Sequence, residues 1–81
     1  MKIQVLVRLK PGVLDVQGKA VEQGIADLGH REVTNVRIGK LVELQVNERT
    51  FEAAKSKVEQ LCSQLLTNPI IENFEIIQAK D

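Results

Sequence analysis

Aromatic side chains are almost absent from this 81-residue chain, which has no tryptophan, no tyrosine and two phenylalanines. A sheet that binds single-stranded RNA stacks the bases on exposed aromatic rings, which this chain cannot supply in number. Positive charge is not in excess either, because 11 basic and 11 acidic side chains give a net charge of zero. Neither nucleic acid nor an anionic membrane surface is therefore an expected partner.

Cysteine and histidine each occur once, as Cys62 and His30. One cysteine cannot form an internal disulfide, and the pair cannot supply the ligands of a zinc site. Cys62 falls on the apolar stripe of a helical pattern, which favours a small buried hydrophobe over a nucleophile. His30 follows a glycine expected to end a helix, which favours a surface or interface position. We predict no catalytic, cofactor-binding or metal-ligating residue in this chain.

Long apolar runs and phosphate-binding motifs are also lacking. No stretch approaches the roughly 20 apolar residues of a membrane span, and the start MKIQVLVRLK is too short and alternating for a signal peptide. The glycines form neither a GxGxxG nor a Walker pattern. The sequence predicts a cytoplasmic protein with one domain, residues 1–81, which at this size gains stability from partners.

The stretch KPGVLDVQGKA, residues 10–20, contains the end of a strand, a turn and the start of a helix. Residues 2–9 alternate apolar and polar, as in a strand, and Pro11 ends that strand because it lacks an amide proton. Gly12 permits the turn, and Asp15 is placed to cap the helix. Gly18 costs its helix about 1 kcal/mol relative to alanine, which indicates close approach of another backbone or side chain.

The first helix has apolar residues at helical spacing between Val16 and Leu28, and Gly29 can end it. We expect this stripe to cover one face of the sheet. A second helix begins after Thr50, a residue type that can cap it, and stops at the Asn68-Pro69 pair. Residues 70–78 form the last strand. Both phenylalanines, Phe51 and Phe74, fit core positions.

The middle segment, residues 33–46, alternates with a single break at Lys40. A two-residue turn at Gly39-Lys40 would place Val36 opposite Glu43 on one face, mixing core with charge. Two readings remain: a hairpin with a three-residue loop at 39–41, or one long strand bent at Gly39. We favour the long strand, which would span roughly 45 Å and overhang a subunit about 30 Å wide.

The predicted fold is therefore α+β, a two-layer sandwich with two helices on one face of an antiparallel or mixed sheet. Its element order is β-α-β(long, bent)-α-β, or a ferredoxin-like βαββαβ if the middle segment folds back. We expect segment 33–46 to pair with a second copy of the chain, because a long unprotected strand edge invites pairing.

Four motifs resemble the PurS family, the small subunit of phosphoribosylformylglycinamidine (FGAM) synthase. They are KPGVLDVQGKA (10–20), ADLG (26–29), VRIGK (36–40) and NPIIENF (68–74), and the likeness covers essentially the whole chain. Two positions depart from the family pattern: Val16 stands where the family usually has proline, and His30 where it usually has phenylalanine or tyrosine.

The resemblance implies a non-catalytic subunit in de novo purine biosynthesis. PurS-like proteins join a glutaminase subunit, PurQ, to an ATP-using synthetase subunit, PurL, and are thought to help ammonia pass between their active sites. ATP and Mg are then expected in the synthetase subunit, and no cofactor in this chain. A self-associating dimer or tetramer is also expected. The alternative is a stand-alone regulatory domain that binds a small molecule between subunits, which would need no motif.

The motif positions also give the predicted partner interface, which consists of Lys10, Asp15, Gln17, Gly18, Arg37, Gly39 and Lys40. Lys10, Gln17 and the residues around the Gly39 bend can reach outward from loops and a first helical turn. Arg37 and Lys40 have no obvious partner within the chain. A solvated polar surface beside a tight turn would explain the same residues, so the assignment relies on the resemblance.

Overall fold

The computed structural model describes residues 1–80. Its elements are β1 (Lys2–Leu9), α1 (Val16–Asp27), β2 (Lys40–Gln45), α2 (Phe51–Leu61), the π-helical turn η1 (Cys62–Leu66) and β3 (Glu72–Gln78). The α+β class is confirmed, and the order β-α-β-α-β is the first of the two predicted orders. No helix in residues 1–80 has the length and apolar character that crossing a membrane requires.

The sheet has the strand order β2-β1-β3, and both pairings are antiparallel, as one of the predicted alternatives had it. The central strand β1 ends at Leu9, just before Pro11, because proline cannot continue the ladder. Val5 lies opposite Val42 on β2 and Ile76 on β3, so apolar side chains meet across all three strands. This alternation gives the sheet one apolar face.

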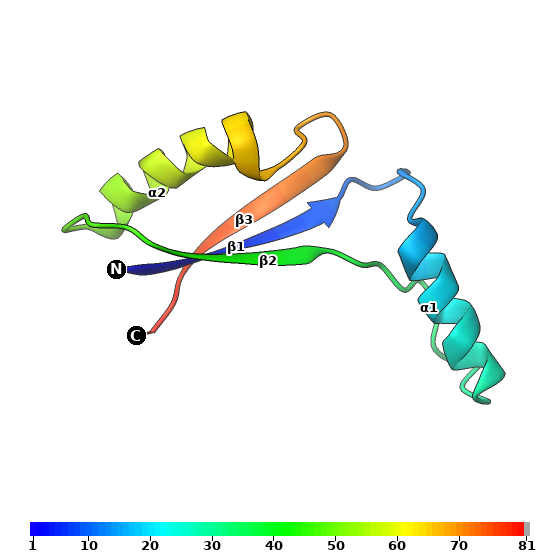
Figure 1. Cartoon of the computed structure of the whole chain (residues 1–81). Coiled ribbons are helices and arrows are strands. Elements are labelled where there is room, and N and C mark those ends of the chain that lie inside the picture. The colour runs from blue at the N-terminus through cyan, green and yellow to red at the C-terminus, as the bar shows by residue number, and fades with distance from the viewer. Residues whose placement is uncertain (81) are drawn as a thin grey trace.

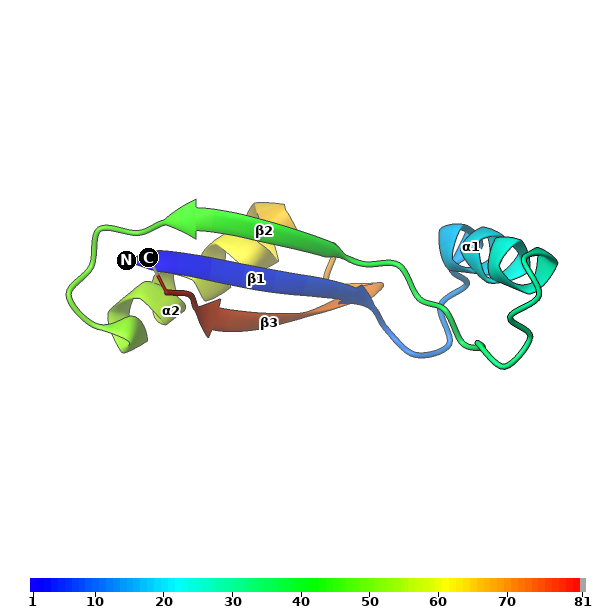
Figure 2. The ribbon, with the colours of Figure 1, turned by 90° about the horizontal axis from the view of Figure 1, so that it is seen from below.

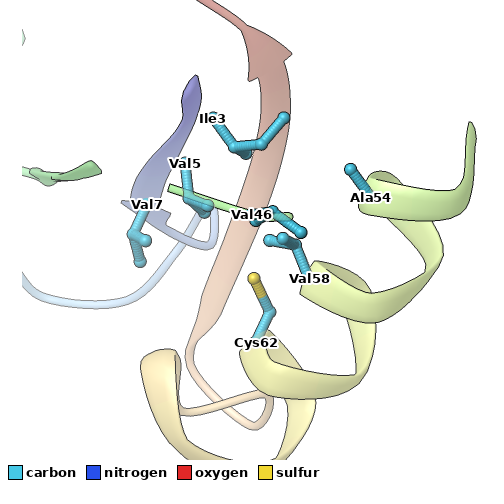
Figure 3. Close-up of a cluster of buried hydrophobic side chains, with 7 residues drawn as sticks. All are labelled: Ile3, Val5, Val7, Val46, Ala54, Val58 and Cys62. Atoms are coloured by element: carbon cyan, nitrogen blue, oxygen red, sulfur yellow. The ribbon is translucent and has the colours of Figure 1, made fainter. Parts of the chain in front are cut away.

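The hydrophobic core lies between that face and α2 (Figures 1 and 3). Thr50 caps α2 as predicted, its hydroxyl oxygen accepting the Ala53 amide proton at 3.2 Å. The helix then turns Ala54, Val58 and Cys62 toward the strands. The fully packed core comprises Ile3, Val5, Val7, Val46, Ala54, Val58 and Cys62, each at most 7 % exposed. Burial of this apolar area supplies most of the favourable free energy of folding.

The first helix does not cover the sheet, contrary to the prediction. In Figures 1 and 2, α1 stands beyond the end of the sheet where β1 finishes, and the chain is correspondingly elongated, 49 × 29 × 14 Å. Its only buried residue is Gly18, whereas Val16 and Leu28 of the apolar stripe are 71 % and 79 % exposed. The two-layer arrangement therefore applies to α2 alone, and the helical periodicity of α1 indicates a face that this chain leaves uncovered.

The middle segment makes one pass and no hairpin, as the favoured reading had it, but its strand is shorter than predicted. Only Lys40–Gln45 pair with β1, and residues 33–39 continue beyond the sheet toward α1 without forming a strand (Figure 2). Asn35 has a positive φ of 57°, which interrupts an extended conformation. The middle segment therefore extends past the end of the sheet, as the prediction of an overhanging segment requires.

The two phenylalanines differ in environment. Phe51, at the start of α2, is half-buried and packs against the core, as predicted. Phe74 on β3 lies opposite Val7 but is 36 % exposed, so its assignment to the core is wrong. Figure 3 shows that α2 and η1 contribute core residues from Ala54 to Cys62. Phe74 lies near the start of β3, the strand that follows η1 in the chain.

Candidate functional site

The seven predicted interface residues gather where the sheet meets α1. We call this region the joint and define it as residues 10–18 and 36–40. The first stretch leads from β1 into α1, and the second leads from the loop after α1 into β2. Although about twenty residues separate the stretches in sequence, they lie side by side, because hydrogen bonds from Ile38 and Arg37 connect them.

Asp15 is the centre of the joint and is only 6 % exposed. Its Oδ1 accepts the Gly18 amide proton at 2.8 Å, which caps α1 as predicted, and its Oδ2 accepts the Ile38 amide proton at 2.7 Å. Two hydrogen bonds lower the pKa of Asp15 below its ordinary value. The larger effect comes from the Ile38 amide and the smaller from the Gly18 amide. The carboxylate thus connects a helix end to the segment that enters β2.

Arg37 has partners within the chain, contrary to the prediction. Its guanidinium donates from Nη1 to the Val13 carbonyl oxygen at 3.0 Å and from Nη2 to the Lys10 carbonyl oxygen at 3.3 Å. Its Nε lies 3.9 Å from Asp15 Oδ2, where its positive charge further favours the ionised carboxylate. Arg37 therefore holds the turn between β1 and α1 in place, so it cannot be treated as a free surface charge.

Two glycines permit close backbone crossings in the joint. A Cβ atom on Gly18 would overlap the Val36 carbonyl oxygen, and one on Gly39 would overlap the Val7 carbonyl oxygen. The first confirms the close approach expected from a glycine in the first turn of a helix. Any larger residue would push the segment 36–39 away from α1 or from β1.

Two hollows flank the segment that enters β2. One, of about 380 Å³, is lined by residues 6–9 and 37–41, and its surface is mainly apolar. The other, of about 220 Å³, is lined by four predicted residues together with Val7, Leu9, Ile38 and Glu72; the four are Asp15, Gln17, Gly39 and Lys40. Lys10 lines neither hollow, and its amide donates to the Ile71 carbonyl oxygen at 2.8 Å.

Sequence reasoning missed Glu22 and the amides that face the helix. Glu22 Oε1 accepts the Val36 amide proton at 3.0 Å, and Asp15 accepts that of Ile38. The spacing of seven between the two carboxylates was a usable signal, because residues two turns apart share one helix face. Nothing in the sequence indicates which distant amides meet that face.

The two residues with reactive side chains lie outside the joint. Cys62 is 0 % exposed, and burial raises the pKa of its thiol, so the thiolate that a nucleophile needs is disfavoured. His30 lies in the exposed loop after α1, with Nδ1 3.5 Å from Glu32 Oε1. The core position of Cys62 and the surface position of His30 are both as predicted.

Comparison with known proteins extends over almost the whole chain. The family model PurS, phosphoribosylformylglycinamidine (FGAM) synthase, matches residues 2–80. The PurS subunit of phosphoribosylformylglycinamidine synthase from Synechocystis sp. is 41 % identical over 71 residues, which is 88 % of this chain and 71 % of that one.

Solved structures give the same result. Methanocaldococcus jannaschii PurS, one of the subunits of formylglycinamide ribonucleotide amidotransferase in the purine biosynthetic pathway, superposes with a TM-score of 0.84 at 34 % identity, covering 94 % of this chain and 92 % of that one. A chain in the structure of PurLQS from Thermotoga maritima has a TM-score of 0.87 at 28 % identity, covering 96 % and 95 %. With its family match and shared fold, this chain belongs to the PurS family of FGAM synthase subunits.

Proposed function

We propose that the chain is the non-catalytic subunit that joins the glutaminase PurQ to the synthetase PurL in FGAM synthase and assists ammonia transfer between them. The observation that carries this proposal is the likeness, over 96 % of the chain, to a chain in the PurLQS structure. The environment of Cys62 also supports it, because a thiol buried in the core with a raised pKa is unsuited to glutamine hydrolysis. Glutamine hydrolysis then belongs to PurQ, and ATP and Mg to PurL.

The surface that we assign to the large subunits is the outward side of the joint. Within residues 1–80, the Lys40 side chain makes no hydrogen bond or ion pair, and it lines both hollows. Gln17 is also exposed and lines the smaller one. Lys10, Asp15, Gly18, Arg37 and Gly39 shape the backbone behind these side chains, so they contribute to the same surface by positioning it.

Self-association accounts for the parts of the chain that the fold leaves uncovered. Both β2 and β3 are edges of the sheet, and residues 33–39 continue past its end. The apolar stripe of α1 is exposed at Val16, Val21 and Leu28. A dimer or tetramer that pairs segment 33–46 with a second copy would cover such surfaces.

The free, buried thiol of Cys62 fits the cytoplasm as the compartment.

Reconstitution with PurL and PurQ tests the bridging role. We expect the three proteins to co-purify, and glutamine-dependent synthesis of FGAM to need this chain, while ammonia-dependent synthesis by PurL needs it much less. Equal glutamine-dependent turnover with and without the chain would reject the proposal. Tight binding of a nucleotide or amino acid to the chain, together with no association with PurL or PurQ, would instead favour the stand-alone regulatory domain.

Charge reversal at Lys40 tests the surface assignment. Lys40→Glu should weaken assembly and glutamine-dependent turnover while the chain stays folded, because within residues 1–80 the Lys40 side chain makes no hydrogen bond or ion pair that the change would break. Lys55→Glu is the matched control, since Lys55 is an exposed lysine on α2, away from the joint. The surface assignment is wrong if the two variants assemble equally well.

A further inference from the structure

The position of α1 depends on few contacts, and hydrogen bonds from the segment before β2 are among them. The helix has no buried apolar side chain, and it makes no extensive contact with another helix or strand in residues 1–80. Residues 36–38 run beside it, as Figure 2 shows for the stretch before β2. The amides of Val36 and Ile38 donate to Glu22 and Asp15, respectively.

These two hydrogen bonds form one geometric unit. Amides two residues apart on an extended segment point to the same side, and carboxylates seven apart lie on one face of a helix. Gly18 lies between the two carboxylates in sequence and lets the Val36 carbonyl approach the helix backbone. Arg37, between the two amides, reaches back to the carbonyls of Lys10 and Val13.

We propose that Asp15 and Glu22 form a two-carboxylate clasp that fixes the position of α1 relative to the sheet. The clasp holds α1 at a constant position although no hydrophobic core supports it. In the assembled enzyme Asp15 and Glu22 are then positioning residues, which act by presenting α1 and the joint in one orientation. This positioning role in the assembled enzyme rests on the proposed function, whereas the clasp itself does not.

Asp15→Asn separates clasping from helix capping. Asparagine remains a good cap, so its oxygen can still accept the Gly18 amide proton, but its NH₂ group cannot accept the Ile38 proton. Glu22→Ala removes the other acceptor. Asp27→Asn is the control. It makes the same charge change on the same helix, at an exposed residue whose carboxylate accepts a hydrogen bond from Gln23 and lies outside the clasp.

Amide hydrogen exchange of the full-length chain, followed by NMR, gives the direct readout. The Ile38 amide should exchange about tenfold faster or more in Asp15→Asn, and the Val36 amide similarly in Glu22→Ala, because a lost acceptor exposes the donor to water. Asp27→Asn should leave both unchanged. Methyl signals of Val5 and Val58 report whether the core stays folded. Unchanged protection of Ile38 and Val36 in the two clasp variants would overturn the clasp.

Titration of PurL and PurQ with each variant tests the positioning role. An open clasp should raise the chain concentration needed for half-maximal glutamine-dependent turnover, while saturating chain restores the parental maximum. A variant with fast-exchanging joint amides and an unchanged half-maximal concentration would overturn that role. If the parental chain gave no activation, the proposed function would fail, and the exchange experiment would still decide the clasp.

Discussion

The two helices have nearly equal lengths but are held in different ways. Helix α2 places Ala54 and Val58 in a packed core and is continued by Cys62. Helix α1 buries only Gly18 and is connected to the segment before β2 by Asp15 and Glu22. A helix of about twelve residues is marginal in water without tertiary support. Packing therefore determines where α2 lies, and hydrogen bonds determine where α1 lies.

The largest expected effect is the loss of stability on trimming the face of α2. Val58→Ala removes two methyl groups from a side chain that is 0 % exposed and leaves a cavity, so the free energy of unfolding should fall by about 2–3 kcal/mol. Urea unfolding monitored by circular dichroism measures this change. A loss below about 0.5 kcal/mol, the size expected of a surface substitution, would break the comparison.

Gly18→Ala is expected to have the next largest effect on the free energy of unfolding. The sign should be opposite to that of the same substitution in an exposed surface helix. Alanine normally stabilises a helix by about 1 kcal/mol relative to glycine. Here the new Cβ would overlap the Val36 carbonyl oxygen, so we expect a net destabilisation of about 1–2 kcal/mol. Gly24→Ala is the control, because a Cβ there meets no atom within 4 Å. If both substitutions stabilise the chain, the close crossing at Gly18 has no energetic weight.

Acidification should release α1 before it loosens the α2 core. The folded chain holds the pKa of Asp15 below its ordinary value of 3.8, so the unfolded chain takes up the proton first as the pH falls. The contribution of Asp15 is complete well above pH 3.8 and is lost as the pH falls through the lower, folded value. Exchange rates at Ile38, corrected for intrinsic pH dependence, should change below pH 4 and stay constant from pH 5 to 7. Asp15→Asn should abolish that change.

The smallest expected effect is Val21→Ala on the stripe of α1. Val21 is 43 % exposed, so unfolding of the dilute chain should change by no more than about 0.5 kcal/mol. Assembly should be more sensitive, because a partner that covers the stripe loses contact with two methyl groups. An effect on stability as large as that of Val58→Ala in the dilute, unassembled chain would show that α1 packs within its own chain.

Local chemistry allowed the helix ends to be predicted. The side chains of Asp15 and Thr50 each accept a hydrogen bond from the amide three residues later, so a window of a few residues contains the whole interaction. The close approach at Gly18 was predictable for the same reason, although its partner, the Val36 carbonyl, was not. The end of β1 was predictable too, because Pro11 and the alternation of residues 2–9 lie next to each other in the sequence.

Long-range placement could not be read from the same patterns. A helical apolar stripe shows that a face is to be buried, but it does not say by which chain, so α1 was wrongly placed on its own sheet. The bonds of Arg37 and Glu22 span fourteen or more residues and left no local signal. Phe74 satisfied strand alternation and lies opposite the buried Val7, yet it is 36 % exposed.

Hydrogen exchange of the two helices, measured in the dilute chain and in the complex with PurL and PurQ, tests the central claim most directly. The claim is that α1 is the helix left for other chains to cover. Amides of α1 should exchange faster than those of α2 in the dilute chain and become more strongly protected on assembly, whereas those of α2 should be protected equally in both. Fast exchange of α1 in the fully assembled complex, or new protection confined to α2, would contradict it.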